Sequence, residues 1–478
     1  MVEVKKNQKY LVVILLLIMM SSSSIAQNMQ KQKSDSIVVL LKKYINAKNA
    51  DAIYDLTGKD YQKDLSRTFL TDFLTNQIFP LGEIKESSFL KLENKTSFYK
   101  LQFEKATLQL SMNLDESNKI GLFLFKPFVA EKPNKPVLIA TSNLLQTPLE
   151  KELDSVIRIY IQKPNTVGLS IGIFKTGKSS TYGYGETAKG NGTLPDANSI
   201  FEIGSISKTF TATLLAYFAD QGKIKLSDPI TKYLPDSVAE NTMLKEVSIR
   251  MLSNHTSGLA PLPDNFETEN YNPLNPYQNY TRKLLFSYLK TCKLKSKPGE
   301  VYAYSNMAAG LLGVILERIS GKSYEDLVKL IICKPLKMKN TAEHLSPQEK
   351  THFVKVYNAE GNETPAWDFD ALQACGSLRS TVNDLLKYAE ANTKTTENQL
   401  SKAFQLTHQL TFSKNQKVGL GWHILKIADA DYLFHNGGTG GSRSFLAFNA
   451  EKKIAVVVLS NSAEPVDAAG INLIKQLQ

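Results

Sequence analysis

Three short segments of the sequence carry residue types that serve in nucleophilic catalysis. The first contains Ser205 and Lys208, at the start of an apolar stretch over 209–219 that we expect to be a helix. A serine at a helix start lies beside free backbone N–H groups, which stabilise an oxyanion. A lysine three residues later lies on the same helix face and can accept or hold the serine proton. The spacing predicts a nucleophilic serine, whereas the alternative is a capping serine beside a solvated lysine.

The second segment is Tyr304-Ser305-Asn306, which precedes an expected helix over 307–319. A tyrosine beside a lysine cation can act as a base, and an asparagine amide can orient a substrate carbonyl. The alternative is a loop tyrosine that packs on the core and an asparagine that caps the helix.

The third segment, from His435 to Gly441, precedes an expected strand over 444–449. Glycines such as Gly437 let a substrate approach the backbone closely, and the N–H of Gly438 can supply a second oxyanion donor. The alternative is a glycine-rich hairpin turn. Because the three segments occur in this order, each beside the local element it needs, together they favour an active site.

The histidines and cysteines do not predict a metal site. No two of the six histidines are separated by four residues, and Cys292, Cys333 and Cys375 are spread through the second half of the chain. The sequence also lacks a G-x-S-x-G elbow, an H-E-x-x-H pair and a P-loop. We therefore expect buried free thiols and a reaction that needs neither metal nor cofactor.

The chain divides into two regions, and the second must position these residues. Over 149–478, helical material lies between terminal strands, expected at 168–174, 179–185, 444–449 and 454–460. This α+β pattern predicts one antiparallel sheet built from both ends of the region, with an inserted helical subdomain. Residues 27–128 show helical periodicity and then strand alternation, which predicts a small α+β domain without catalytic groups of its own. In element order alone it loosely resembles the cone-shaped nuclear-transport-factor-like domains, and the proline-containing stretch 129–148 predicts a linker.

Residues 1–26 predict a secretory signal peptide. Lysines precede the apolar stretch 11–20, and Ser24-Ile25-Ala26 follows as a small-x-small cleavage site. The stretch is shorter than the roughly 20 residues that span a bilayer, and no cysteine follows it for a lipid anchor. We expect a secreted protein, periplasmic or extracellular, without a stable membrane anchor; an uncleaved anchor is the alternative.

Composition excludes several classes of protein. The 478 residues exceed the roughly 100–200 of one domain, and 42% hydrophobic with 22% charged residues indicates a globular chain. The net charge is +11, from 57 Lys+Arg and 46 Asp+Glu. These cations form no run of the kind that binds nucleic acid, so the excess indicates solubility or weak affinity for anionic surfaces.

The three segments resemble those of the serine β-lactamase-like superfamily, which includes class C β-lactamases, D-alanyl-D-alanine carboxypeptidases, D-aminopeptidases and related esterases. The resemblance covers 149–478 and extends to the segments 252–259, 310–313, 376–380 and 419–422. It implies a penicillin-binding-protein-like transpeptidase fold.

The resemblance also implies a role for each residue. Ser205 would be the nucleophile of an acyl-enzyme, Lys208 its activating partner, and Tyr304 the base that becomes the acid for the leaving group. The substrate-binding residues would be Asn306, His435, Gly437 and Gly438.

The chain departs from the class A β-lactamase pattern in its second and third segments. It has Tyr304-Ser305-Asn306 in place of Ser-Asp-Asn and His435-Asn436-Gly437 in place of Lys-Thr-Gly. The third-segment lysine helps hold the carboxylate of the drug, so the chain looks more like the carboxypeptidase and esterase branches. Arg443 either replaces that lysine through its bidentate fork or is a solvated strand residue. We expect His435 to donate a hydrogen bond to substrate, with its pKa lowered by Lys208.

The sequence thus predicts a secreted serine hydrolase that acts through an acyl-enzyme on a small peptide, amide or ester, including cell-wall-derived ones. The alternatives are a class C-type β-lactamase and a non-catalytic penicillin- or peptidoglycan-binding protein.

Overall fold

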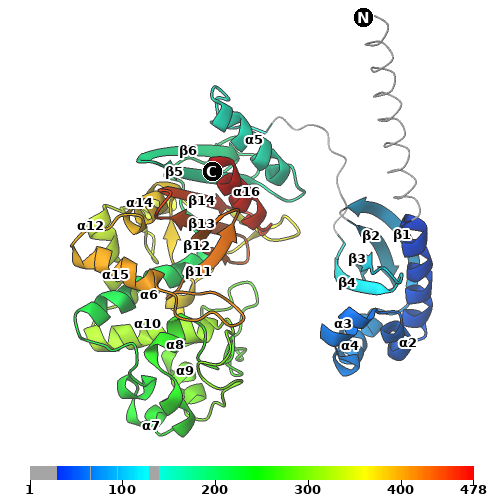
Figure 1. The fold of residues 1–478 in the computed structure, drawn as a ribbon, viewed down its shortest axis with the longest axis horizontal. Helices are drawn as coiled ribbons and strands as arrows, with labels where there is room; N and C mark the ends of the chain where they lie inside the picture. Colours follow the sequence, from blue (N-terminus) through cyan, green and yellow to red (C-terminus); the bar gives the residue numbers. More distant parts are fainter. Residues whose placement is uncertain (1–29, 65, 94, 129–138) are drawn as a thin grey trace, which may run out of the picture. The chain divides into compact units, whose positions relative to one another are not determined.

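The computed structural model describes residues 30–478 except 65, 94 and 129–138 (Figure 1). The expected signal peptide, residues 1–26, lies outside the described residues. The chain divides into two compact units between Pro133 and Asn134. In the described part of the chain, no helix combines the length and apolar character needed to cross a membrane.

The N-terminal unit consists of helices followed by a four-stranded antiparallel meander, in the order that the sequence predicts. Residues 30–46 form its first helix. Further helical elements follow: α2 (Ala50–Asp55), α3 (Lys59–Asp64), α4 (Arg67–Phe73), the π turn η1 (Leu74–Ile78) and the 3-10 turn η2 (Phe79–Leu81). The strands pair in chain order: β1 (Ile84–Glu93), β2 (Thr96–Phe103), β3 (Thr107–Leu114) and β4 (Ile120–Pro127).

The second unit is built on a six-stranded antiparallel sheet of order β11-β12-β13-β14-β5-β6. Its strands are β5 (Gly168–Lys175), β6 (Lys178–Gly185), β11 (His423–Ile427), β12 (Ala430–Gly438), β13 (Arg443–Asn449) and β14 (Ile454–Ser460). Strands from the two ends of the region lie side by side, with Leu169 of β5 opposite Ser460 of β14. The predicted sheet from both termini is therefore confirmed.

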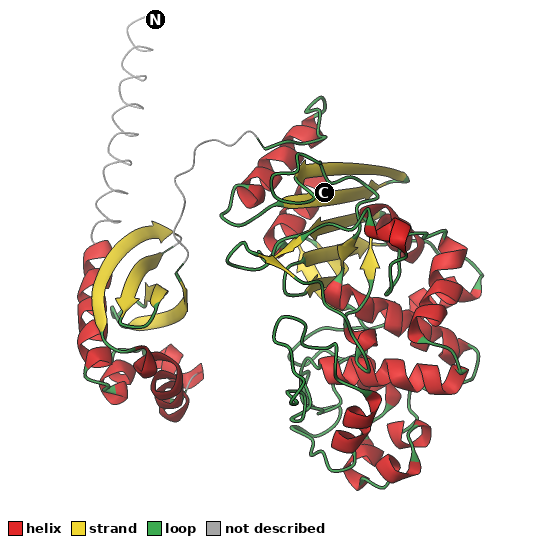
Figure 2. Ribbon diagram, turned by 180° about the vertical axis from the view of Figure 1, so that it is seen from behind, coloured by secondary structure: helices red, strands yellow, loops and turns green. Residues whose placement is uncertain are grey.

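Helices cover both faces of this sheet (Figure 2). The terminal helices α5 (Pro148–Ile161) and α16 (Asp467–Leu477) pack on one face, against residues such as Ile171 and Val458. On the other face, Val382 and Leu386 of α14 (Val382–Asn392) come so close to Gly172 that a Cβ there would clash. Because both faces are buried, β14 is a continuous apolar run rather than an alternating one.

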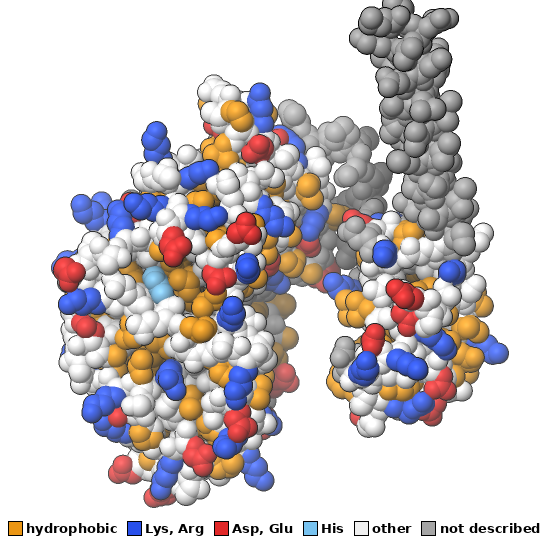
Figure 3. All heavy atoms as spheres, viewed as in Figure 1, with side chains coloured by type: hydrophobic (Ala, Val, Ile, Leu, Met, Phe, Trp, Pro, Cys, Tyr) orange, Lys and Arg blue, Asp and Glu red, His pale blue; other side chains and the backbone are white. Residues whose placement is uncertain are grey.

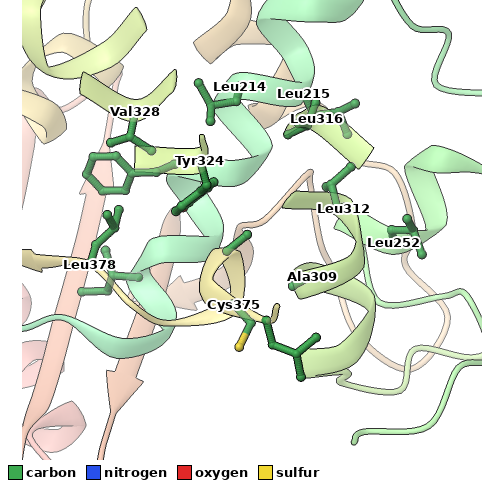
Figure 4. Close-up of a cluster of buried hydrophobic side chains, with 14 of the residues drawn as sticks. Leu214, Leu215, Leu252, Ala309, Leu312, Leu316, Tyr324, Val328, Cys375 and Leu378 are labelled. Carbon is green, nitrogen blue, oxygen red and sulfur yellow. The ribbon is translucent and has the colours of Figure 1, made fainter. Parts of the chain in front are cut away.

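The inserted helical region surrounds α6 (Ser207–Asp220), which is buried along most of its length. Leu214, Leu215, Leu312, Leu316 and Tyr324 meet there in one apolar cluster between α6, α10 (Asn306–Ser320) and α11 (Tyr324–Val328) (Figure 4). The remaining helical elements are η3 (Gly204–Ile206), η4 (Ile230–Tyr233), α7 (Asp236–Ala239), η5 (Thr242–Glu246), α8 (Ile249–Ser253), α9 (Arg282–Leu289), η6 (Lys329–Cys333), α12 (Lys334–Leu336), α13 (Pro347–Lys350), η7 (Gln373–Cys375) and α15 (Gln399–His408). Short strand pairs join β7 (Phe201–Glu202) to β10 (Arg379–Ser380) and β8 (Val356–Tyr357) to β9 (Glu363–Thr364).

Two further features bear on the sequence analysis. Cys292, Cys333 and Cys375 are buried free thiols, as expected. The end of the stretch assigned as a linker lies against β6, because the Ser142 N–H donates to the Gly183 carbonyl and the Gly185 N–H to the Ala140 carbonyl.

Candidate active site

Ser205 lies in the single 3-10 turn η3, which leads directly into α6. Its side chain is half-buried. The preceding residue, Gly204, has a φ of +49°, and a Cβ there would lie 2.6 Å from the backbone nitrogen of Gly438. Only glycine fits both this conformation and this close approach, so the turn that carries Ser205 depends on it.

Lys208 is buried beside Ser205, with 3% of its surface exposed. Its Nζ donates to Ser205 Oγ at 2.9 Å, to Asn306 Oδ1 at 2.8 Å and to the Cys375 carbonyl at 2.6 Å. An ammonium group has three hydrogens and no lone pair. All three are therefore used, and a charged Lys208 donates to Ser205 and cannot take its proton.

Asn306 is the first residue of α10, after the capping residue Ser305. Its Oδ1 accepts from Lys208, and its Nδ2 donates to the Tyr277 hydroxyl at 2.9 Å. These two contacts fix the orientation of the amide. Nδ2 carries two hydrogens and uses one of them within the described residues, so the other can donate to a ligand.

Tyr304 lies between a cation and an imidazole. Lys208 Nζ is 4.8 Å from the centre of its ring, and the ring centre of His255 is 4.3 Å away. The rings of His423 and His435 lie farther out, with centres at 6.4 and 6.3 Å.

These three imidazoles are neutral at physiological pH. Burial, followed by the charge of Lys208, lowers the pKa of His423 to about 4. Burial is also the largest cause that holds the pKa of His255 and His435 well below the ordinary value. For His435 the lowered pKa agrees in direction with the sequence-based expectation, but burial and then His423 contribute more than Lys208. Lys208 is thus the cation that Tyr304 meets in this cluster.

The side chain of His435 is 1% exposed and does not face solvent. Its Nδ1 lies 2.6 Å from the carbonyl oxygen of Asn436, and its Nε2 is buried without a hydrogen-bond partner in the described part of the chain. A carbonyl can only accept, so Nδ1 carries the proton and Nε2 is an acceptor. The expected donor role of His435 toward substrate is therefore wrong for the neutral ring.

Gly437 and Gly438 belong to the end of strand β12, not to a hairpin turn. A Cβ on Gly437 would lie 2.1 Å from the Ile203 carbonyl oxygen and 2.9 Å from the Ser205 nitrogen. Ser444 of β13 fastens the same turn, because its hydroxyl donates to the Ile203 carbonyl at 2.8 Å. The glycines thus let a strand edge pack directly on the turn of Ser205.

Arg443 lies on the other face of the sheet. It is one residue before Ser444, whose side chain points to the turn of Ser205, and successive strand residues alternate between faces. Its Nη1 donates to the carbonyls of Thr439 and Ser442, and Tyr160 of α5 is among its neighbours. Neither interpretation of Arg443 is correct: it is half-buried, and it faces away from the site.

Sequence reasoning missed several neighbours of the catalytic candidates. Tyr277 and the carbonyl of Cys375 hold Asn306 and Lys208, and no local pattern marks either one. His423 begins strand β11, which was not predicted. Its Nε2 is hydrogen-bonded to the Tyr302 hydroxyl at 2.7 Å. His255 lies in the segment 252–259, which contributed to the family resemblance. Within the described residues, no group of three His, Cys, Asp or Glu could hold a metal ion.

Comparison with known proteins identifies the family of the second unit. The family model described as Beta-lactamase matches residues 153–477. A beta-lactamase of Pseudomonas fluorescens is 28% identical over 365 residues, which cover 68% of this chain and 97% of that protein. The D-alanyl-D-alanine-carboxypeptidase/endopeptidase AmpH of Escherichia coli strain K12 is 31% identical over 297 residues, 58% of this chain and 75% of that protein.

Solved structures agree in fold. A class C beta-lactamase matches with a TM-score of 0.63 and 25% identity, covering 70% of this chain and 98% of its own. A beta-lactamase/D-alanine carboxypeptidase from Pseudomonas syringae matches with a TM-score of 0.62 at 23% identity, a similarity that supports the fold alone. The chain belongs to the beta-lactamase family of serine hydrolases.

Proposed function

We propose that this serine hydrolase acts through an acyl-enzyme on Ser205. The observation that carries the proposal is the bond from Lys208 Nζ to Ser205 Oγ at 2.9 Å, at the start of a buried helix. The backbone N–H groups of Ser205 and Gly438 belong to two segments packed on one turn, and they are the candidates for the oxyanion hole.

Tyr304 is the proposed base, because the three hydrogens of Lys208 are already used. In the proposed reaction Tyr304 acts in its phenolate form and takes the Ser205 proton as Oγ bonds to the substrate carbonyl carbon. The bond from that carbon to the leaving group then breaks, and Tyr304 returns the proton to the leaving group. Water attacks the ester by the same route and releases the acid.

The proposed substrates are small peptides, amides or esters, including fragments of the cell wall. Relatives named beta-lactamase and carboxypeptidase support both this reading and a class C-type β-lactamase. The neutral and buried His435 favours the first, because it offers no cation for the carboxylate of a β-lactam drug. We also propose export through residues 1–26, on sequence pattern alone.

The test combines covalent labelling with turnover. A fluorophosphonate probe is expected to add one label to the wild type, detected by intact mass, and none to Ser205→Ala. Ser287→Ala is the matched control, because Ser287 also precedes a lysine by three residues and is exposed. Labelling of Ser205→Ala would contradict the nucleophile assignment.

Turnover separates the alternatives. Ester or D-alanyl-D-alanine cleavage that exceeds nitrocefin cleavage supports the proposed substrates, and the reverse order supports a β-lactamase. A stable penicillin adduct without turnover of any substrate would indicate a non-catalytic binder.

A further inference from the structure

A cavity lies at the opposite end of α6 from Ser205. Its volume is about 1000 Å³, at the upper end of the range typical of small-molecule sites. The C-terminal parts of α6, α10 and α14 line it, together with η6, α12 and the start of α15. None of the residues proposed for catalysis contributes to its wall, so it is separate from the site described above.

The floor of this cavity is apolar. Phe218, Ile331, Leu400 and Phe404 line it and are themselves buried. Leu330, with 49% of its surface exposed, lies among the lining residues and extends the apolar surface toward solvent. An apolar floor of this kind suits an alkyl chain, because each buried methylene contributes about 0.8 kcal/mol.

The wall of the same cavity is strongly basic. Its charged residues are one acid and five lysines: Glu390, Lys223, Lys322, Lys337, Lys387 and Lys394. In the described part of the chain, only Lys387 and Lys394 of these lysines form ion pairs, with Asp384 and Glu390. Figure 3 shows Lys and Arg side chains gathered over the edge that α12, α14 and α15 form. The cavity therefore presents uncompensated positive charge beside an apolar floor.

Helix ends offer a simpler reason for these lysines. Several helices end here, and a lysine near a helix C-terminus is favoured by the partial negative charge of the last carbonyls. However, Lys387 is the one lysine of the set whose Nζ donates to a carbonyl in the described residues, that of Lys337. The ammonium groups of Lys322 and Lys337 are exposed and engage no helix carbonyl there, so they are available to a ligand.

We propose that this cavity binds a fatty acid of about twelve carbons. The alkyl chain lies over the floor of Phe218, Leu400 and Phe404, and the carboxylate pairs with Lys322 and Lys337. An acid satisfies both features, whereas an alkyl alcohol leaves the lysines unpaired and an alkyl ammonium is repelled by them.

The experiment titrates the full-length protein with dodecanoate by calorimetry, below the concentration at which dodecanoate forms micelles. We expect saturable binding of one molecule, with weaker binding of dodecanol and of dodecyltrimethylammonium. The double variant Lys322→Glu/Lys337→Glu is expected to bind about tenfold more weakly, a difference of about 1.4 kcal/mol. The matched control is Lys452→Glu, an exposed lysine that does not line the cavity.

A photoreactive diazirine analogue of dodecanoate locates the site independently of affinity. Crosslinks are expected in peptides that cover 327–337 or 390–404. Crosslinks confined to the surroundings of Ser205 would overturn the proposal, as would unsaturable binding. Equal affinity for dodecanol, or a double variant that binds like the wild type while its Tm falls, would assign the lysines to the helix ends and reject the fatty acid site.

Discussion

The Nδ1 atom of His435 lies 2.6 Å from the carbonyl oxygen of Asn436, the next residue of β12. This contact sets the tautomer of the ring and leaves the lone pair of Nε2 facing the protein interior. The pKa of His435 is held well below its ordinary value, first by burial and then by His423 and Lys208. Where Lys-Thr-Gly enzymes carry a permanent cation, this chain carries an uncharged acceptor.

Because His435 does not titrate near neutral pH, it should not shape the pH profile there. We expect kcat/KM of His435→Gln on a neutral ester to keep the wild-type pH dependence between about pH 5.5 and 8, whatever its absolute level. The measurement is kcat/KM across this range for both proteins. An inflection near pH 6.5 that the wild type shows and the variant lacks would mean that the ring is charged in the free enzyme.

Ser205 and Lys208 should differ sharply in their contribution to stability. Ser205→Ala removes one half-buried hydroxyl and is expected to lower the free energy of unfolding by no more than about 1 kcal/mol. Lys208→Met leaves Asn306 Oδ1 and the Cys375 carbonyl without their donor, and should cost about 2 kcal/mol or more. Urea denaturation of both variants checks this order, and equal losses would contradict the bonding of Lys208.

His408 should make the protein sensitive to acid. Burial lowers the pKa of His408 to about 4 in the folded protein. In the unfolded chain the ring takes up a proton near pH 6.5, so folding opposes its protonation between these two pH values. Its contribution is complete above pH 6.5 and is lost as the pH falls toward 4, by up to about 3 kcal/mol. Nε2 lies 2.9 Å from Asn392 Oδ1, a contact that His408→Gln can preserve.

We therefore expect His408→Gln to lose less stability than the wild type between pH 7 and pH 4.5. Urea denaturation at the two pH values gives the comparison. The other buried histidines also destabilise the folded protein in acid. The variant should therefore still lose stability between the two pH values, but less than the wild type loses. An identical decline in both proteins would rule out His408 as a source.

Glu343 should act in the opposite direction. It is buried, and neither carboxylate oxygen has a hydrogen-bond partner in the described residues. Burial, with a further contribution from Glu325, raises its pKa to about 8. The folded protein therefore keeps this proton where the unfolded chain has lost it, and stability falls as the pH rises from about 4.5 to 8, by at most about 5 kcal/mol.

Glu343→Gln is expected to be more stable than the wild type at pH 8, with the advantage shrinking toward pH 5. An exposed acid provides the control, because Glu451→Gln should change stability little at either pH. Denaturant titrations at pH 5 and 8 measure both. A variant less stable than the wild type at pH 8 would show that the carboxylate is ionised and paired.

The sequence predicts those elements of the fold that carry their own local signals. Helix α5 carries such signals, because Thr147 and Glu150 form a capping box and Pro148 occupies the first turn. Strand β12 was not predicted, since Asp431 on one side of its apolar centre and Asn436 with two glycines on the other make its ends turn-like. Pairing with β13 overrides that weak propensity, and such pairing cannot be read from a local pattern.

The candidate site divides in the same way. Ser205 and Lys208 are neighbours on one helix start, so spacing alone brings them together. The contacts of Asn306 with Tyr277, and of Lys208 with the carbonyl of Cys375, join parts of the chain that only the tertiary fold places side by side. The burial of His435 likewise depends on the tertiary fold, which places the His423 ring beside it. Its donor role was predicted wrongly because Nδ1 lies against the Asn436 carbonyl, a contact that the sequence does not reveal.

The pairing of β5 with β14 has a consequence for synthesis on the ribosome. β5 and β6 emerge early and can form their hairpin at once, but the other edge of β5 has no strand beside it until β14, near the end of the chain, has been made. Contacts between residues so distant in sequence form slowly, and an apolar strand edge that waits for its partner is prone to aggregation. The nascent chain must therefore keep β5 protected through nearly the whole of translation, and loss of the last strand leaves the sheet open at its centre.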